Sequence, residues 1–297
     1  MQSDRILDLE SLKDAVQDKK LQIHYQKLKK IKGICIPNSE GDDDYEIEAE
    51  KLDLMHASLR HLPKSIKVNG TCVRSFESLK YIKMEGVLPI DLKKLKRLAV
   101  LNGTVADNVT EAKTFGNLSA LQLLYLSECS KLATLPPTFG QLKSLVWLEM
   151  EGCEAITTLP NSFGNLSALI ILDLNSCSNL SSLPESFSQL SCLQYLSMGG
   201  CERLTSLPNN FGELKSLKFL LIEDCSNLKT LNGDFGSLAS LMALKVSNCE
   251  SLDGEAVDIL VKMKSLMFVK IYGSERMIER WKEIGQHYPL IVIGDDE

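Results

Sequence analysis

The stretch "CSKLATLPPTFGQLKSL", residues 129–145, recurs almost unchanged further along the chain. The chain reads "CEAITTLPNSFGNLSAL" at 153–169 and "CSNLSSLPESFSQLSCL" at 177–193, so successive copies start 24 residues apart. From Leu121 the full template is L-x-x-L-x-L-x-x-C-x-x-L-x-x-L-P-x-x-F-G-x-L-x-x. A single copy cannot bury its own apolar face, so a repeat of this kind predicts a solenoid in which each copy forms one coil.

The template predicts a different local structure for each half of a coil. The alternating leucines of "LxxLxL" have period two, which is typical of a short strand with its leucines turned inward. The later half contains Pro160, Pro184 and Pro208, which exclude a long helix and favour turns and short 3₁₀ helices. We therefore predict an α/β leucine-rich-repeat solenoid, a horseshoe with a parallel concave β-sheet, an irregular or 3₁₀ convex side and helical terminal caps.

The ends of the chain depart from the template. We expect an N-terminal helical or irregular cap or linker over 1–60, leucine-rich repeats over 61–273, regular over 121–265, and a C-terminal cap over 274–297. Within the N-terminal part we expect helical stretches in 6–33, a strand at "ICIP" and a flexible acidic loop over 37–44. Further along we expect irregular strands at 65–70, 78–86 and 97–103, and a last regular strand within 266–273. Between them, residues 251–266 should form a helix-like run that turns Ala256, Val257, Leu260 and Met263 inward. An amphipathic helix should follow Ser274, its N-cap, and turn Met277, Ile278, Trp281 and Ile284 inward.

One cysteine column keeps the period of the repeat. It lies where the chain leaves each strand, a place where interior backbone groups need hydrogen-bond partners. A thiol is small and carries a weak donor, so we interpret the column as a structural ladder of reduced thiols and not as a metal site. The ladder comprises Cys129, Cys153, Cys177, Cys201, Cys225 and Cys249.

Composition and motifs argue against several classes of function. The net charge of −6 argues against nucleic-acid binding, and no apolar stretch reaches the length of a membrane span. The chain has neither a phosphate-binding glycine loop nor a catalytic serine or cysteine motif, so we expect no enzyme activity, no cofactor and no metal. The N-terminus does not resemble a signal peptide, and we expect a cytoplasmic protein.

The side chains between the core leucines should point outward on the concave sheet. They form an aromatic and aliphatic stripe beside an acidic patch, which is typical of protein-binding surfaces. The candidate partner-binding residues are Trp147, Tyr195, Phe219, Phe268, Tyr125, Glu149, Glu151 and Asp173. The alternative is that large β-formers at these positions only pack across strands. If they bind a partner, alanine at Trp147 and Tyr195 should abolish its capture and leave thermal stability nearly unchanged.

The repeat also resembles a known family. "LQYLSMGGCERLTSLPNNFGELKSL" (193–217) and the end "IERWKEIGQHYPLIVI" are similar to the C-terminal leucine-rich repeats of plant intracellular disease-resistance proteins, which carry a nucleotide-binding domain ahead of the repeats. The resemblance covers about residues 60–293. It implies recognition of a pathogen effector or host protein, and inhibition of a nucleotide-binding domain in the same chain. No such domain is present in this sequence, so a freestanding cytosolic adaptor or scaffold for a host protein is the alternative.

Overall fold

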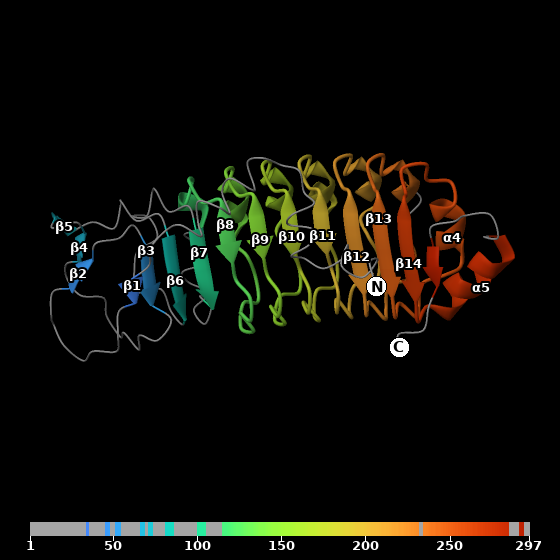
Figure 1. Ribbon diagram of the computed structural model, residues 1–297, viewed down its shortest axis with the longest axis horizontal. Coiled ribbons are helices and arrows are strands. Elements are labelled where there is room, and N and C mark those ends of the chain that lie inside the picture. Colours follow the sequence, from blue (N-terminus) through green and yellow to red (C-terminus); the bar gives the residue numbers. More distant parts are fainter. Residues whose placement is uncertain are drawn as a thin grey trace.

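We analysed a computed structural model of the chain (Figure 1). It describes residues 115–231 and 234–284, together with the backbone of the strands outside these ranges. Those outer strands are β1 (Ile34–Cys35), β2 (Tyr45–Ile47), β3 (Lys51–Leu54), β4 (Ile66–Val68), β5 (Thr71–Val73), β6 (Tyr81–Glu85), β7 (Val100–Thr104) and β15 (Ile291–Ile293). The central strands are β8 (Leu123–Tyr125), β9 (Trp147–Glu149), β10 (Ile171–Asp173), β11 (Tyr195–Ser197), β12 (Phe219–Glu223), β13 (Ala243–Ser247) and β14 (Phe268–Tyr272).

Each regular coil contributes one strand to a parallel sheet. The strand order is β1-β3-β6-β7-β8-β9-β10-β11-β12-β13-β14-β15. Ile171 of β10 pairs with Trp147 of β9 and with Tyr195 of β11, residues 24 positions away on either side. The register therefore equals the sequence period, and equivalent side chains form columns across the sheet. The predicted leucine-rich-repeat solenoid is confirmed.

The side of the coil away from the sheet is built from short 3₁₀ helices, as the prolines predict. They are η4 (Phe115–Asn117), η5 (Pro137–Gln141), η6 (Phe163–Asn165), η7 (Glu185–Gln189), η8 (Phe211–Glu213) and η9 (Phe235–Ser237). Each of the last five helices places a fully buried phenylalanine in the core. Successive rings from Phe139 to Phe235 stack with centroids 6.0–6.3 Å apart.

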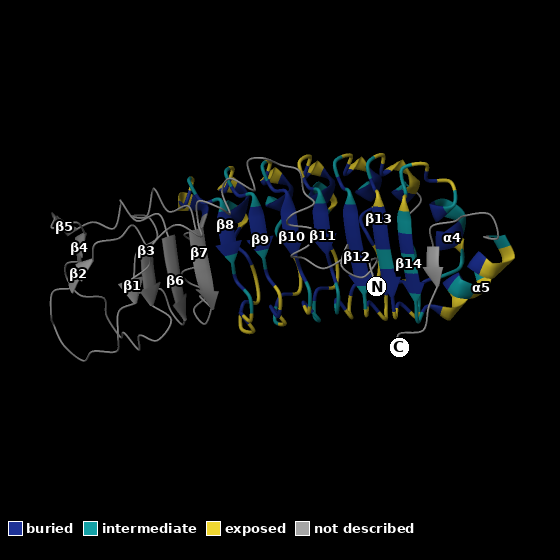
Figure 2. Ribbon diagram, in the orientation of Figure 1, coloured by how far each residue is buried: buried dark blue, intermediate teal, exposed yellow. Residues whose placement is uncertain are grey.

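Leucines fill the space between the sheet and the 3₁₀ helices. The template leucines of every described coil are almost completely buried and form one continuous cluster with the phenylalanines and the ladder cysteines. Figure 2 shows this uninterrupted buried layer along the coils. No coil has a core of its own, so the stability of each coil depends on its two neighbours.

The C-terminal end is covered by two helices, α4 (Glu255–Leu260) and α5 (Glu275–Ile284). Ala256, Val257, Leu260 and Met263 are buried, as predicted, and so are Met277 and Trp281 of α5. Ile278 and Ile284 are only half-buried. An ion pair joins α5 to α4, in which Nη2 of Arg280 lies 3.1 and 3.2 Å from the two carboxylate oxygens of Asp258.

The structure differs from the local expectations at Ser274 and at residues 65–70. The hydroxyl of Ser274, expected to cap α5, instead accepts the backbone N–H of Cys249 at 3.1 Å. Residues 65–70, expected as an early repeat, contain β4, which pairs with β2 and β5 in a separate sheet. The strands predicted at "ICIP", 78–86, 97–103 and 266–273 correspond to β1, β6, β7 and β14. The expected helices within 6–33 and the expected acidic loop at 37–44 lie outside the described residues, and the domain boundaries stay a prediction.

Candidate protein-interaction surface

The sheet carries a second apolar layer on the face turned away from the core, which we call the strand face. Most of its side chains come from one column of equivalent positions that pair across successive strands, and the others come from the two columns on either side of it. The cluster comprises Leu123, Trp147, Ile170, Ile171, Tyr195, Phe219, Leu221 and Ala243, with Tyr125, Val146 and Phe268 half-buried against it. The predicted stripe is therefore assembled on a single face.

These side chains are less exposed than the sequence predicts. Trp147 and Tyr195 are each 3% exposed and Phe219 is 8% exposed. The expectation that alanine at Trp147 and Tyr195 would leave stability unchanged is wrong, because removing buried aromatic side chains typically costs about 3–5 kcal/mol each. The burial agrees with the alternative of cross-strand packing, so the column forms an apolar floor. Tyr125 keeps partial exposure on this floor, with its ring centroid 5.7 Å from that of Trp147.

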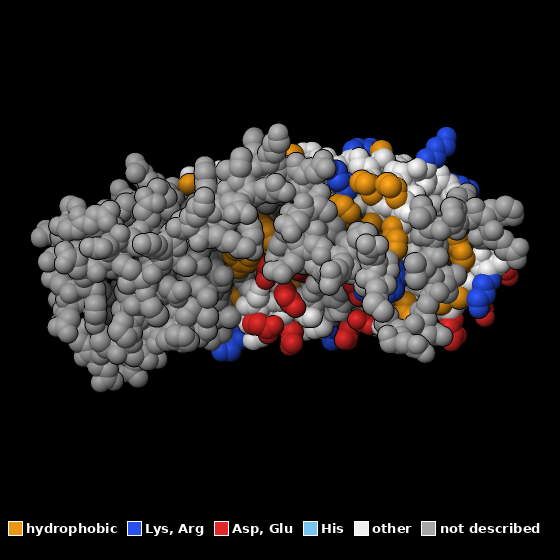
Figure 3. Space-filling model, viewed as in Figure 1, with side chains coloured by type: hydrophobic (Ala, Val, Ile, Leu, Met, Phe, Trp, Pro, Cys, Tyr) orange, Lys and Arg blue, Asp and Glu red, His pale blue; other side chains and the backbone are white. Residues whose placement is uncertain are grey.

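The acidic candidates differ in their surroundings. Glu149 is half-buried and accepts a hydrogen bond from the hydroxyl of Ser127 at 2.8 Å. Asp173 is buried, and its Oδ1 accepts the backbone N–H of Asn175 at 2.9 Å. Glu151 is exposed. Figure 3 shows acidic side chains gathered along the edge of the molecule where the central strands end. Of the three predicted acids, Glu151 is therefore the most accessible to a basic side chain of a partner.

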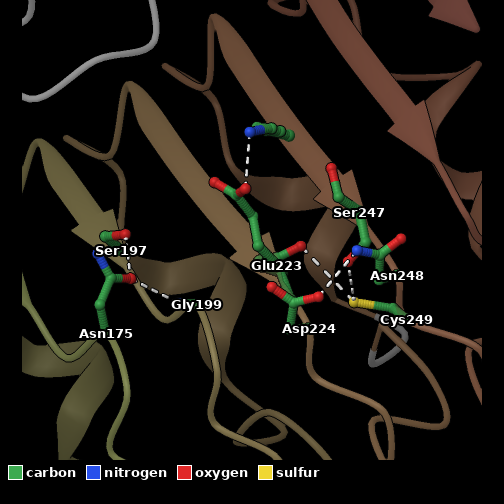
Figure 4. Close-up of polar contacts among 10 residues, drawn as sticks. Asn175, Ser197, Gly199, Glu223, Asp224, Ser247, Asn248 and Cys249 are labelled. Atoms are coloured by element: carbon green, nitrogen blue, oxygen red, sulfur yellow. Dashed lines mark hydrogen bonds and ion pairs between the residues drawn. The ribbon is translucent and has the colours of Figure 1, made fainter. Parts of the chain in front are cut away.

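Polar contacts connect neighbouring coils at the same edge (Figure 4). Asn175 Oδ1 accepts hydrogen bonds from the Ser197 hydroxyl at 2.6 Å and from the Gly199 N–H at 2.7 Å. Further along, Lys245 Nζ lies 2.6 Å from Glu223 Oε2. These contacts fix the side chains that border the floor, so the surface is ordered before any partner arrives.

The cysteine column forms a ladder of thiol hydrogen bonds. The Cys177 thiol donates to the carbonyl oxygen of Met150 at 3.3 Å, and this oxygen also accepts the N–H of Cys153 at 3.2 Å. The same contact recurs from Cys153, Cys201, Cys225 and Cys249 to the carbonyl 27 residues earlier, over 3.0–3.6 Å. Each of these five thiols therefore joins its coil to the preceding one at a buried turn.

Burial keeps the thiols of Cys177 and Cys201 protonated at neutral pH. All six ladder cysteines are buried and none forms a disulfide. Burial raises the pKa of the Cys177 thiol to about 12, and burial likewise raises the pKa of Cys201. A protonated thiol has a hydrogen to donate, whereas a thiolate does not. The predicted structural role of the ladder is thus supported by its geometry.

Sequence reasoning missed a second column, directly before the six ladder cysteines and before Ser274 in the last coil. Its residues have positive φ in every described coil: Glu128, Gly152, Ser176, Gly200, Asp224, Asn248 and Gly273, with φ from 51° to 72°. This left-handed turn reverses the chain after each strand and aims the following residue into the core. Glycine, Asn and Asp at most of these positions are the signal that could have revealed it, because these residues adopt positive φ at low cost.

The described residues contain neither a cluster of metal ligands nor a membrane-spanning helix. No group of three or more His, Cys, Asp or Glu side chains could hold a metal ion in this part of the chain. Among the same residues, no helix has the length and apolar character needed to span a bilayer.

Comparisons with known proteins agree with the fold. Residues 147–291 match a family model described as a leucine-rich repeat region. The leucine-rich repeat domain of the type III effector XopL is 17% identical over 95% of this chain and 87% of that chain, with a TM-score of 0.53. TLR13, solved in complex with ssRNA13, is 23% identical over 82% of this chain and 36% of that chain, also with a TM-score of 0.53. No curated protein shows a significant match. At these identities the likeness supports the solenoid fold.

Proposed function

We propose that this chain is a protein-recognition module that binds its partner on the strand face. The observation that carries the proposal is the second apolar layer, because the solenoid core is already complete on the opposite face of the sheet. Tyr125, Val146 and Phe268 keep part of this apolar layer accessible to solvent, and accessible apolar surface on a folded protein is typical of sites that bind another protein. Leucine-rich repeat regions are in general interaction modules and not catalysts.

The contact residues that we assign are the side chains on this face that keep solvent exposure. Tyr125 and Phe268 are half-buried at either end of the floor, Glu149 is half-buried, and Glu151 is exposed. Aromatic side chains held in place by a rigid support are frequent hot spots, because little side-chain entropy remains to be lost on binding. Trp147, Tyr195 and Phe219 form that support, and Asp173 orders the border. A partner with an apolar contact and a basic side chain near Glu151 fits this arrangement.

In its full context we infer that the module senses a pathogen effector or a guarded host protein as part of a plant intracellular immune receptor. The repeat form with its cysteine column supports this proposal. In such a receptor a nucleotide-binding domain in the same chain would be a further partner, and the protein would be cytoplasmic. Neither nucleic acid nor a membrane span enters the proposal.

Capture of the partner from source tissue, compared between two surface variants, tests the binding proposal. Tyr125→Ala combined with Glu151→Lys should abolish capture and lower the melting temperature only slightly, because both side chains are partly or fully exposed. Glu213→Lys changes an exposed glutamate of η8, on the other side of the coil, and is the matched control. Capture that survives in the double variant would exclude the strand face as the binding surface.

Intact mass of the native protein tests the receptor context. A species much larger than 33.0 kDa, with a nucleotide-binding domain on the same polypeptide, supports the receptor. A native species of 33.0 kDa that co-purifies with a separate partner would contradict the receptor proposal and support a freestanding adaptor. The proposal that the strand face binds a protein would be unaffected.

A further inference from the structure

Two methionines form an exposed apolar pair at the amino-terminal ends of β13 and β14. Met242 is 37% exposed and Met267 is 56% exposed, and they are the exposed large hydrophobic residues of the described part of the chain. The Met267 N–H donates to the Met242 carbonyl at 2.8 Å, so the two residues are neighbours on adjacent coils. Figure 3 shows hydrophobic side chains at this edge of the molecule, above β13.

The pair is specific to this end of the solenoid. The equivalent positions of the preceding coils are occupied by Gln122, Val146, Ile170, Gln194 and Lys218, each of them half-buried or buried. The repeat therefore does not require an exposed apolar side chain here. Half-buried Phe268 follows Met267 directly and extends the apolar surface onto the sheet. Packing within the coils therefore does not explain why these two methionines are exposed.

Lysines flank the methionines. Lys218 adjoins Met242 on the preceding coil, since its carbonyl accepts the Met242 N–H at 2.8 Å. Lys264 is exposed and lies three residues before Met267, in the turn that leads into β14, with exposed Lys262 close by in sequence. Within the described residues no ion pair occupies the ammonium groups of Lys218, Lys262 or Lys264. The patch is thus cationic in a chain whose net charge is −6.

We propose that Met242 and Met267, flanked by Lys218 and Lys264, form a second docking surface, for an acidic protein segment with an apolar anchor side chain. The anchor rests on the two thioethers, whose flexible and polarisable side chains adapt to the shape of a partner. Carboxylates of the segment lie over the lysines, where complementary charge speeds encounter and sets orientation. This surface lies at the opposite ends of the strands from Glu151, so it extends beyond the recognition function proposed above.

A protein segment fits the patch better than a membrane does. Binding to an anionic bilayer needs a wide apolar face together with many cations. Only two methionines protrude here, and the overall negative charge of the chain opposes approach to anionic lipid. A short segment with one apolar anchor and a few carboxylates matches both the size and the charge of the patch.

Selection from an immobilised library of short random peptides tests the proposal. We expect the selected peptides to be rich in Asp and Glu and to carry a Leu, Phe or Met. Lys218→Glu with Lys264→Glu should weaken their binding at least about tenfold, and added salt should weaken binding to the wild-type protein. Met242→Ser with Met267→Ser should weaken binding to a similar degree and lower the melting temperature only slightly, because both side chains lie at the surface.

Two controls separate the possible outcomes. Lys143→Glu with Lys229→Glu makes the same charge change at exposed sites elsewhere and should leave peptide binding unchanged. Tyr125→Ala with Glu151→Lys should also leave it unchanged, so failure here and failure of the strand-face proposal are distinguishable. Selected peptides without acidic enrichment would overturn the proposal, and so would lysine and methionine variants that bind the peptides as tightly as the wild-type protein does. So would binding to phosphatidylserine vesicles without binding to any peptide.

Discussion

Replacing the thiol of Cys177 tests whether the cysteine ladder stabilises the solenoid through hydrogen bonds. The thiol donates to Met150 O at 3.3 Å and is completely buried. Alanine removes one hydrogen bond, about 0.5–1.5 kcal/mol, and about 1 kcal/mol of buried apolar contact. The Met150 carbonyl still accepts the N–H of Cys153, so no acceptor is left unpaired. We therefore expect Cys177→Ala to lower the free energy of unfolding by about 1.5–2.5 kcal/mol.

A serine variant separates the hydrogen bond from packing. Serine keeps a donor but is more polar than a thiol, so it improves on alanine only if the bond to Met150 O matters. Urea unfolding of the wild type, Cys177→Ala and Cys177→Ser gives the three free energies of unfolding, which can be compared provided that the three proteins have the same m-value. We expect the order wild type, serine, alanine. An alanine variant as stable as the wild type, or a serine variant less stable than alanine, would refute the hydrogen-bond account.

Four further predictions concern the same coils. The stabilisation by Cys177 should be complete below about pH 9 and should fall by about 1.4 kcal/mol per pH unit as the pH rises towards 12. The reason is that burial raises the pKa of the thiol in the folded protein, so the thiol of the unfolded chain ionises first. The difference in unfolding free energy between wild type and Cys177→Ala, followed over this pH range, measures the loss. Gly164→Ala should cost about 1–3 kcal/mol or more, since its Cβ would lie 1.8 Å from the Ser186 carbonyl oxygen, whereas Gly236→Ala, whose nearest contact is 3.4 Å away, should be mild; equal urea midpoints would contradict this. Ser176→Gly should stabilise by about 0.5–1 kcal/mol by relieving its φ of 56°, and Gly200→Ser should do the reverse; calorimetry that finds both neutral would remove the argument from backbone strain. Iodoacetamide should modify exposed Cys192 in the native protein and spare the six ladder cysteines until the chain unfolds, as peptide mapping would show; native labelling of the ladder would disprove its burial.

The repeat period was sufficient to predict most of the fold. Leucine spacing places the strands, and the prolines place the 3₁₀ helices η5 to η8. Cys177 and its equivalents occupy the turn that the period assigns to them. These features depend on contacts between equivalent residues of adjacent coils, and a sequence repeat identifies those equivalent residues directly. The C-terminal helices were predictable for the same reason, because their apolar faces continue the core.

The strand face was harder to predict. Alternation shows that Trp147 and Tyr195 point away from the core, but it cannot show how completely they are buried on the other face. Likewise the hydroxyl of Ser274 could cap a helix or bind the preceding coil, and only the arrangement of Cys249 in space decides between these roles. The residues with positive φ share a backbone angle and not a side-chain type. Glu128 and Ser176 interrupt the run of Gly, Asn and Asp in this column, so the sequence pattern does not show it clearly.

Site-specific photocrosslinking tests the central claim, that the strand face recognises a protein. A photoreactive amino acid replaces Glu151 at the border of the apolar floor, and in a parallel sample it replaces Glu213 in η8, which is also exposed. After irradiation in source tissue, we predict that one protein is crosslinked repeatedly from position 151 and not from position 213. Crosslinks of equal yield from both positions, or from position 213 alone, would contradict the assignment of the strand face.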